Sequence, residues 1–136
     1  RSSLYRSLQI AKEECLKTIE KNNIVHMLID KYIIDNNEYP FLPKDLKCEY
    51  FSLDLTFICI SEEIIKKVEI LMKEFHISVD QIISANYLES FFTESDKDLD
   101  VWAFKISNGF NENEVRFNEK KRENQGFFER FFNFFR

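Results

Sequence analysis

Apolar and polar residues alternate along Phe51–Ile60, and this period of two predicts a strand with one buried face and one wet face. Successive side chains of a strand point to opposite faces, so every second residue belongs to the buried face. The residues assigned to that face are Phe51, Leu53, Leu55, Phe57 and Cys59.

The residues after this strand predict an amphipathic helix. Ser61 stands at the N-cap position, and Glu62 and Glu63 fall in the first turn, where the helix dipole favours negative charge. Apolar residues then recur at helical spacing, which predicts that this face lies on the sheet. They are Ile64, Val68, Leu71, Met72 and Phe75.

The residues before the strand predict one helix and further strands. Apolar positions at helical spacing place an amphipathic helix within residues 1–22. Ile24–Ile29 and Lys31–Asp35 are rich in β-forming residues and make either one bent strand or two. Residues 36–45, with their asparagines and prolines, predict a loop. Leu46–Tyr50 extends the central strand, with a bulge where Phe51 breaks the alternation.

The residues after the helix predict the rest of the sheet. Gln81–Ser84 is expected to form a short strand, and Ala85–Phe92 one or two helical turns. Leu99–Ile106 is expected to close the sheet, and residues 108–125 have the composition of a polar linker. On one face of that last strand lie Trp102, Phe104 and Ile106. The chain therefore predicts an α+β fold: a small, mostly antiparallel sheet over residues 23–107, covered by one main helix.

Six phenylalanines among the last ten positions predict an amphipathic helix over residues 126–136. At about 100° per residue they cover an arc of roughly 160°, opposite the polar residues of the segment. So short a helix needs a surface, which is a membrane interface, a partner's groove or the domain's own core; the polar linker favours the membrane. Phe127, Phe128, Phe131, Phe132, Phe134 and Phe135 are predicted to insert, and Lys120, Lys121, Arg122 and Arg130 to meet anionic lipid head groups.

Composition limits the classes of function. The 136 residues, 44% of them hydrophobic, are enough for one modest core. The net charge of -5 argues weakly against nucleic acid as a partner. The sequence shows no apolar run long enough to span a membrane and no leader, and its start at Arg1 suggests a piece of a longer protein or a processed chain. The three cysteines are expected to be buried free thiols in a reducing compartment.

No pattern of catalytic, metal or cofactor chemistry is found. The two histidines are fifty positions apart, the cysteines lack ligand spacing, and two glycines cannot build a phosphate-binding loop. His26 lies in an apolar strand and is expected to be a hydrogen-bonded core residue. Acidic runs such as Asp96–Asp100 are expected to be solvated. The sequence therefore predicts a protein that is not an enzyme.

Several short patterns occur together in a known order. His26, Tyr32 and Asp35 are spaced as a strand histidine, an aromatic residue and an aspartate, and Pro43 follows. A strand–helix unit, the VDQIIS segment and an acidic stretch come next, and the chain ends in GFFERFFNFFR. In this order the chain resembles the FtsA family, the actin-like proteins that tether the bacterial division ring to the membrane. The resemblance covers the family's inserted 1C subdomain, over residues 24–107, and its amphipathic membrane-targeting tail, over residues 120–136.

The resemblance does not extend to the family's phosphate loop. Where the family has an aspartate followed by glycines, this chain has Lys105–Gly109, in which a lysine replaces the magnesium-orienting acid. The rest of the actin-like body has no counterpart in the chain. The resemblance therefore implies a reduced or partial relative that retains the inserted subdomain and the anchor.

The resemblance implies a membrane-tethered protein-interaction module of the bacterial cell-division machinery. Its place would be the cytoplasmic face of the inner membrane, as a peripheral protein. Its partners would be anionic lipid, further copies of itself or other division proteins. Two alternatives remain open: a degenerate actin-like ATPase fragment, and a soluble adaptor whose Phe-rich tail docks in a partner's groove.

Overall fold

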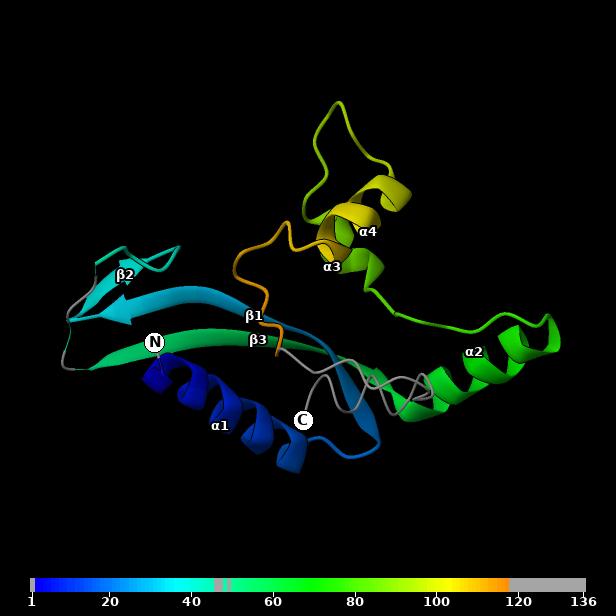
Figure 1. Cartoon of the computed structure of the whole chain (residues 1–136), viewed down its shortest axis with the longest axis horizontal. Helices are drawn as coiled ribbons and strands as arrows, with labels where there is room; N and C mark the ends of the chain where they lie inside the picture. Colours follow the sequence, from blue (N-terminus) through cyan, green and yellow to red (C-terminus); the bar gives the residue numbers. More distant parts are fainter. Residues whose placement is uncertain (1, 46–47, 49, 118–136) are drawn as a thin grey trace. The chain divides into compact units, whose positions relative to one another are not determined.

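The computed structural model describes residues 2–45, 48 and 50–117, and in these ranges the fold is α+β. Three strands form one antiparallel sheet in the order β2-β1-β3, so that β1 lies in the middle (Figure 1). The strands are β1 (Asn22–Ile34), β2 (Asn37–Tyr39) and β3 (Phe51–Ser61). The helices are α1 (Ser2–Thr18), α2 (Glu62–Glu74), α3 (Ala85–Glu89) and α4 (Leu99–Ser107).

The predicted fold class is confirmed, and the strand predictions hold in part. The two runs expected before residue 36 form the single strand β1. In β3, residues 51–57 alternate between half-buried and exposed as predicted, but the alternation then shifts, so that Cys59 is exposed. The predicted strand Leu46–Tyr50 does not appear at Cys48 and Tyr50, and residues 46, 47 and 49 lie outside the described ranges.

A tight turn joins β1 to β2 within the segment predicted as a loop. Asp35 and Asn36 have φ of 49° and 67°, a left-handed conformation that aspartate and asparagine tolerate better than most residues. Two such residues match the twist of an antiparallel hairpin, and Ile34 pairs with Asn37 directly across the turn. The loop prediction missed β2 because it took the asparagines as the end of the strand rather than as its turn.

The prediction of a strand at Leu99–Ile106 is wrong, because the segment forms α4. The Asp98 side chain accepts hydrogen bonds from the backbone N–H groups of Asp100 and Val101, which caps the helix. Trp102 and Ile106 are one helical turn apart and both are buried, whereas Phe104 is exposed. The apolar residues of this segment fit a helical period as well as an alternating one, so the pattern alone did not separate the two.

The neighbouring predictions divide similarly. The predicted strand at Gln81–Ser84 is wrong, because no strand forms there. The helical turns expected after it are confirmed as α3, and the Ser84 side chain accepts a hydrogen bond from the backbone N–H of Tyr87. The helix expected near the N-terminus is confirmed as α1.

The segment predicted as a polar linker is attached to β1 in its first half. Leu28 and Glu114 form an antiparallel bridge. The N–H of Ile29 donates to the carbonyl of Asn113 and that of Val115 to the carbonyl of Met27, both at 2.8 Å. Residues 113–115 are therefore paired with Met27–Ile29 of β1 through their backbone. Residues 118–125 lie outside the described ranges.

The chain divides into two compact units, which are described separately. Unit 1 contains the described residues of 2–25, 58–83 and 116–117, and unit 2 contains those of 26–57 and 84–115. In unit 1, Phe117 is buried beneath α1, where its ring lies 5.7 Å from that of Tyr5 and 4.5 Å from the Nζ of Lys12. In unit 2, α3 and α4 pack on each other, with Phe91 and Trp102 stacked between them.

Candidate protein-binding surface

Helix α2 of unit 1 begins without a loop. Ser61 is both the last residue of β3 and the N-cap of α2, and its Oγ accepts a hydrogen bond from the N–H of Glu63 at 3.2 Å. Glu62 and Glu63 occupy the first turn, and Lys73 the last, as the helix dipole favours. The helix ends where His76 takes a left-handed φ of 57°. The predicted cap and helix are thus confirmed.

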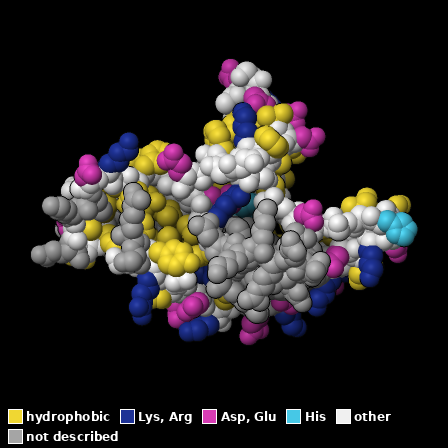
Figure 2. Space-filling model, viewed as in Figure 1, with side chains coloured by type: hydrophobic (Ala, Val, Ile, Leu, Met, Phe, Trp, Pro, Cys, Tyr) yellow, Lys and Arg dark blue, Asp and Glu magenta, His cyan; other side chains and the backbone are white. Residues whose placement is uncertain are grey.

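Of the five apolar residues predicted to lie on the sheet, Met72 is half-buried and the other four are instead exposed. The exposed fractions are 51% for Ile64, 36% for Val68, 50% for Leu71 and 66% for Phe75. These four side chains, three along α2 and Phe75 at its C-cap, are named here the α2 face, and Figure 2 shows hydrophobic side chains at the surface of this helix. The prediction is wrong because a helix turns back over the strand that it follows only after a loop of several residues, and this junction has none.

A different side of the helix provides its packing. Ile65, one position from the α2 face, is 1% exposed, and Glu69 and Met72, four and seven positions further on, are half-buried. Helix α2 therefore has two neighbouring apolar stripes. The stripe through Ile65 is buried or half-buried, and the α2 face meets no described residue that buries it.

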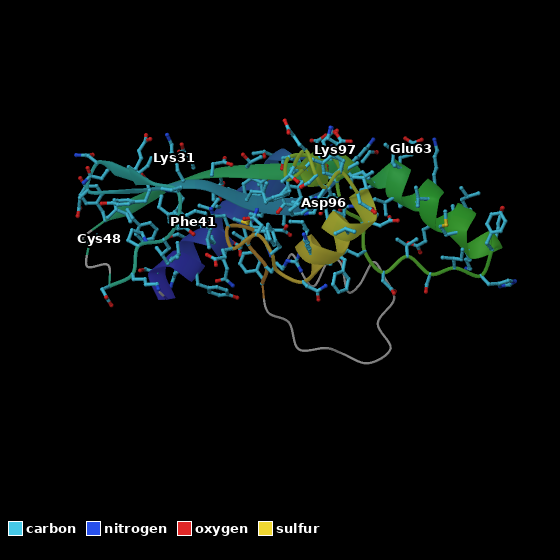
Figure 3. The ribbon with its side chains drawn as sticks, turned by 90° about the horizontal axis from the view of Figure 1, so that it is seen from above. Lys31, Phe41, Cys48, Glu63, Asp96 and Lys97 are labelled. Atoms are coloured by element: carbon cyan, nitrogen blue, oxygen red, sulfur yellow. The ribbon has the colours of Figure 1, made fainter. Side chains whose placement is uncertain are left out.

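The charges around the α2 face favour a protein partner over lipid. Interfacial membrane helices carry mainly lysine and arginine on the polar side, where they meet anionic head groups. Helix α2 has acidic and basic residues interspersed, and the Nζ of Lys67 lies 3.0 Å from a carboxylate oxygen of Glu63, which is labelled in Figure 3. The acidic residues are Glu62, Glu63, Glu69 and Glu74, and the basic ones are Lys66, Lys67 and Lys73.

In unit 2, a buried hydrogen-bond network surrounds His26. The N–H of Ser84 donates to Nε2 of His26 at 3.0 Å, so this nitrogen carries no proton. Nδ1 therefore carries it and faces Oε2 of Glu114 at 3.4 Å. The hydroxyl of Tyr87 donates to the other oxygen of Glu114 at 2.7 Å and accepts from the amide of Asn111 at 2.8 Å.

This network is structural rather than catalytic. A histidine that acts as a base needs a free ring nitrogen within reach of a substrate. Here one nitrogen of His26 is held by a backbone amide and the other by Glu114, and the two side chains are only 2% and 8% exposed. The prediction that His26 is a hydrogen-bonded core residue is confirmed. Glu114 was missed, because nothing in the pattern of its polar segment distinguishes it.

The position compared with a phosphate loop also offers no cradle. Such a loop binds phosphate through free backbone N–H groups. The N–H groups of Asn108, Gly109 and Phe110 donate instead to carbonyls of α4, at 3.0–3.2 Å. The ammonium of Lys105 lies 4.3 Å from the centre of the Trp102 ring, where it is also 3.8 Å from Asp96.

The thiols differ from the prediction. All three thiols were expected to be buried. Cys59 is instead exposed, and Cys15 and Cys48 are half-buried. Cys15 of α1 and Cys59 of β3 are in hydrogen-bonding contact within unit 1. Partial burial raises the pKa of both thiols, and the negative charge of a neighbouring thiolate would raise that of Cys59 further. Raised pKa values keep both sulfurs protonated and weakly nucleophilic.

The residues predicted to bind membrane all lie outside the described ranges. They are Phe127, Phe128, Phe131, Phe132, Phe134, Phe135, Lys120, Lys121, Arg122 and Arg130. Among the described helices, none is long and apolar enough to cross a bilayer. No cluster of three or more histidine, cysteine or acidic side chains suited to a metal ion occurs in the described part of the chain.

The comparisons with known proteins give no relative. No protein-family model, no curated protein and no solved structure matches this chain.

Proposed function

We propose that this chain is a non-enzymatic protein-interaction module held at a membrane surface. The observation that carries the interaction role is the α2 face, where four large apolar side chains remain exposed on a capped, regular helix. Exposed apolar patches on a folded protein commonly mark binding sites, since leaving them in water is unfavourable. An amphipathic helix face is a recurrent recognition element, read at positions i, i+4 and i+7.

The sequence of residues 126–136 supports the membrane role. Each phenylalanine buried at a lipid interface contributes up to about 1.5–3 kcal/mol before ordering costs. The basic residues at 120–122 add about 1 kcal/mol each near an anionic surface. Eight residues separate Phe117, the last described residue, from Gly126, and they can span at most roughly 28 Å. The anchor would thus hold the domain close to the bilayer.

The resemblance to FtsA supports a setting in bacterial cell division. In that setting the module lies at the cytoplasmic face of the inner membrane and binds copies of itself or other division proteins. The ATPase alternative has less support, because the N–H groups of Asn108, Gly109 and Phe110 are already bonded.

Flotation with lipid vesicles tests the anchor. The full chain is mixed with vesicles of neutral lipid alone or with about a third anionic lipid, and is expected to float only with the anionic vesicles. Substituting Phe131→Ser and Phe132→Ser together is expected to reduce the bound fraction at least tenfold. Asn133→Ser, on the polar side of the predicted helix, is the matched control and is expected to leave the bound fraction unchanged.

Two outcomes would overturn the anchor. One is flotation that persists after removal of residues 126–136. The other is binding that depends on neither the phenylalanines nor the anionic lipid.

A further inference from the structure

The α2 face is self-complementary, and we infer that its occupant is the α2 face of a second copy of this chain, packed antiparallel about a twofold axis. This inference rests on the proposed interaction role and names the surface and the partner. It concerns unit 1 alone.

The apolar residues match in the antiparallel direction. When two copies of α2 run in opposite directions, Ile64 of one lies opposite Phe75 of the other, and Val68 lies opposite Leu71. The matching is reciprocal, as a twofold interface requires. It pairs the large ring at one end with a β-branched side chain at the other, and so avoids placing two rings against each other.

The charges beside the face match in the same arrangement. At about 100° per residue, Lys67 and Glu74 lie on one edge of the α2 face, roughly 60° and 80° from Ile64. An antiparallel twofold pair brings this edge against the same edge of the second copy. Lys67 of one copy then lies opposite Glu74 of the other, and the reverse pair forms as well. Both side chains are exposed in the single chain, where Lys67 lies beside Glu63 and can turn to a second carboxylate.

The parallel arrangement does not fit. In a parallel twofold pair, the edge that carries Lys67 and Glu74 meets the opposite edge of the second helix. That edge carries Ile65 and Met72, which are already buried and half-buried in the single chain. In the parallel pair, Lys67 and Glu74 would therefore face apolar side chains, at a cost in desolvation.

The size of the surface sets the expected strength. Stable interfaces bury about 1,200–2,000 Å² in total, and four side chains on one helix of 13 residues bury less. The dimer is therefore expected to be weak in solution and to form at high protein concentration. Attachment to a membrane would raise the local concentration and favour it.

Charge reversal tests the pairing. The full chain is examined by sedimentation without lipid, over concentrations from about 10 to several hundred micromolar. Lys67→Glu and Glu74→Lys are each expected to weaken the dimer at least tenfold, because each places like charges opposite each other. The double variant exchanges the two charges and is expected to restore the affinity of the original chain.

A matched apolar pair completes the test. Leu71→Ser is expected to abolish association, whereas Ile70→Ser, exposed on the same helix but outside the α2 face, is expected to leave it intact. Circular dichroism of each variant verifies that the helix is retained. The double variant restores the pairing between the two copies but not the contact of residue 67 with Glu63 within one chain. Recovery of affinity in this variant therefore assigns the effect to the pairing.

Several results would overturn the inference. They are a chain that stays monomeric at all concentrations, association unaffected by Leu71→Ser, and a double variant as weak as the single ones. Association lost on removal of residues 126–136 but retained in Leu71→Ser would assign it to the tail instead. Because lipid is absent, a chain that dimerises but does not float overturns the anchor alone.

Discussion

Two regions of the molecule depart from the usual pattern in opposite directions. The network around His26 buries polar groups, whereas the α2 face exposes apolar ones. In unit 2, His26, Glu114 and Tyr87 lie inside and are hydrogen-bonded to one another and to the backbone. In unit 1, the four apolar side chains of the α2 face are exposed, and no described residue covers them. Polar groups inside a protein are tolerated when hydrogen-bonded, whereas apolar groups outside gain most from a partner. The first region therefore supports the architecture, and the second is the one proposed to bind a partner.

The sharpest test of this comparison uses two neighbouring isoleucines of α2. Ile65→Ala removes a side chain that is fully buried, and is expected to lower the free energy of unfolding by about 2–5 kcal/mol. Ile64→Ala, on the α2 face, is expected to change it by less than about 0.5 kcal/mol. Urea denaturation at low protein concentration, where the chain is monomeric, measures both. Equal losses would mean that the α2 face is part of the core.

The next largest effect is expected in the network itself. Glu114→Ala removes the acceptor for both His26 and Tyr87, and leaves two buried donors without it. The expected loss is about 1–3 kcal/mol in the free energy of unfolding. Glu112→Ala, two residues away and exposed, is the control and is expected to be nearly neutral. A neutral Glu114 variant would break the assignment of this network to architecture.

The N-cap of α2 is expected to contribute less. Ser61→Ala removes the oxygen that accepts from the N–H of Glu63 and is expected to cost about 1 kcal/mol. Ser61→Asp keeps an acceptor at the same place and is the matched control. Denaturation is again the measurement, and an alanine variant as stable as the aspartate variant would show that the direct strand-to-helix junction does not depend on this cap.

The same residues show how far sequence reasoning reaches. The alternation of residues 51–57 and the Ser61 cap are local patterns, and both were predicted. The orientation of α2 depends on a junction without a loop, which hydrophobic periodicity does not register, so the wrong stripe was assigned to the core. In Leu99–Ile106 two periods fit one set of residues, and packing of Trp102 and Ile106 decided for the helix. The pairing of Glu114 with His26 joins residues 88 positions apart, beyond any local signal.

An alkaline titration gives a smaller effect, located in the sheet. Burial raises the pKa of the Tyr32 hydroxyl above its ordinary value of 10.0. Below that value the residue is neutral in both states and its contribution to stability is complete. As the pH rises further, the unfolded chain loses this proton first, so stability falls until the raised pKa is passed. Tyr32→Phe is expected to remove this part of the alkaline loss, and denaturation at a series of pH values measures it.

The last prediction is that nucleotide has no effect on the stability of the chain. At the turn after α4, the N–H groups that follow Lys105 are bonded within α4, and the lysine itself lies between Trp102 and Asp96, so this turn offers no free donors to a phosphate. ATP with magnesium is therefore expected to leave the melting temperature of the chain unchanged. A nucleotide at a hundred times its dissociation constant would add about 2.7 kcal/mol of stability, which a thermal shift assay detects easily. Such a rise would show that the chain binds nucleotide, and would return the ATPase alternative to first place. If Lys105→Ala removed the rise while Lys97→Ala, on the exposed loop before α4, did not, the bound phosphate would be located at this turn.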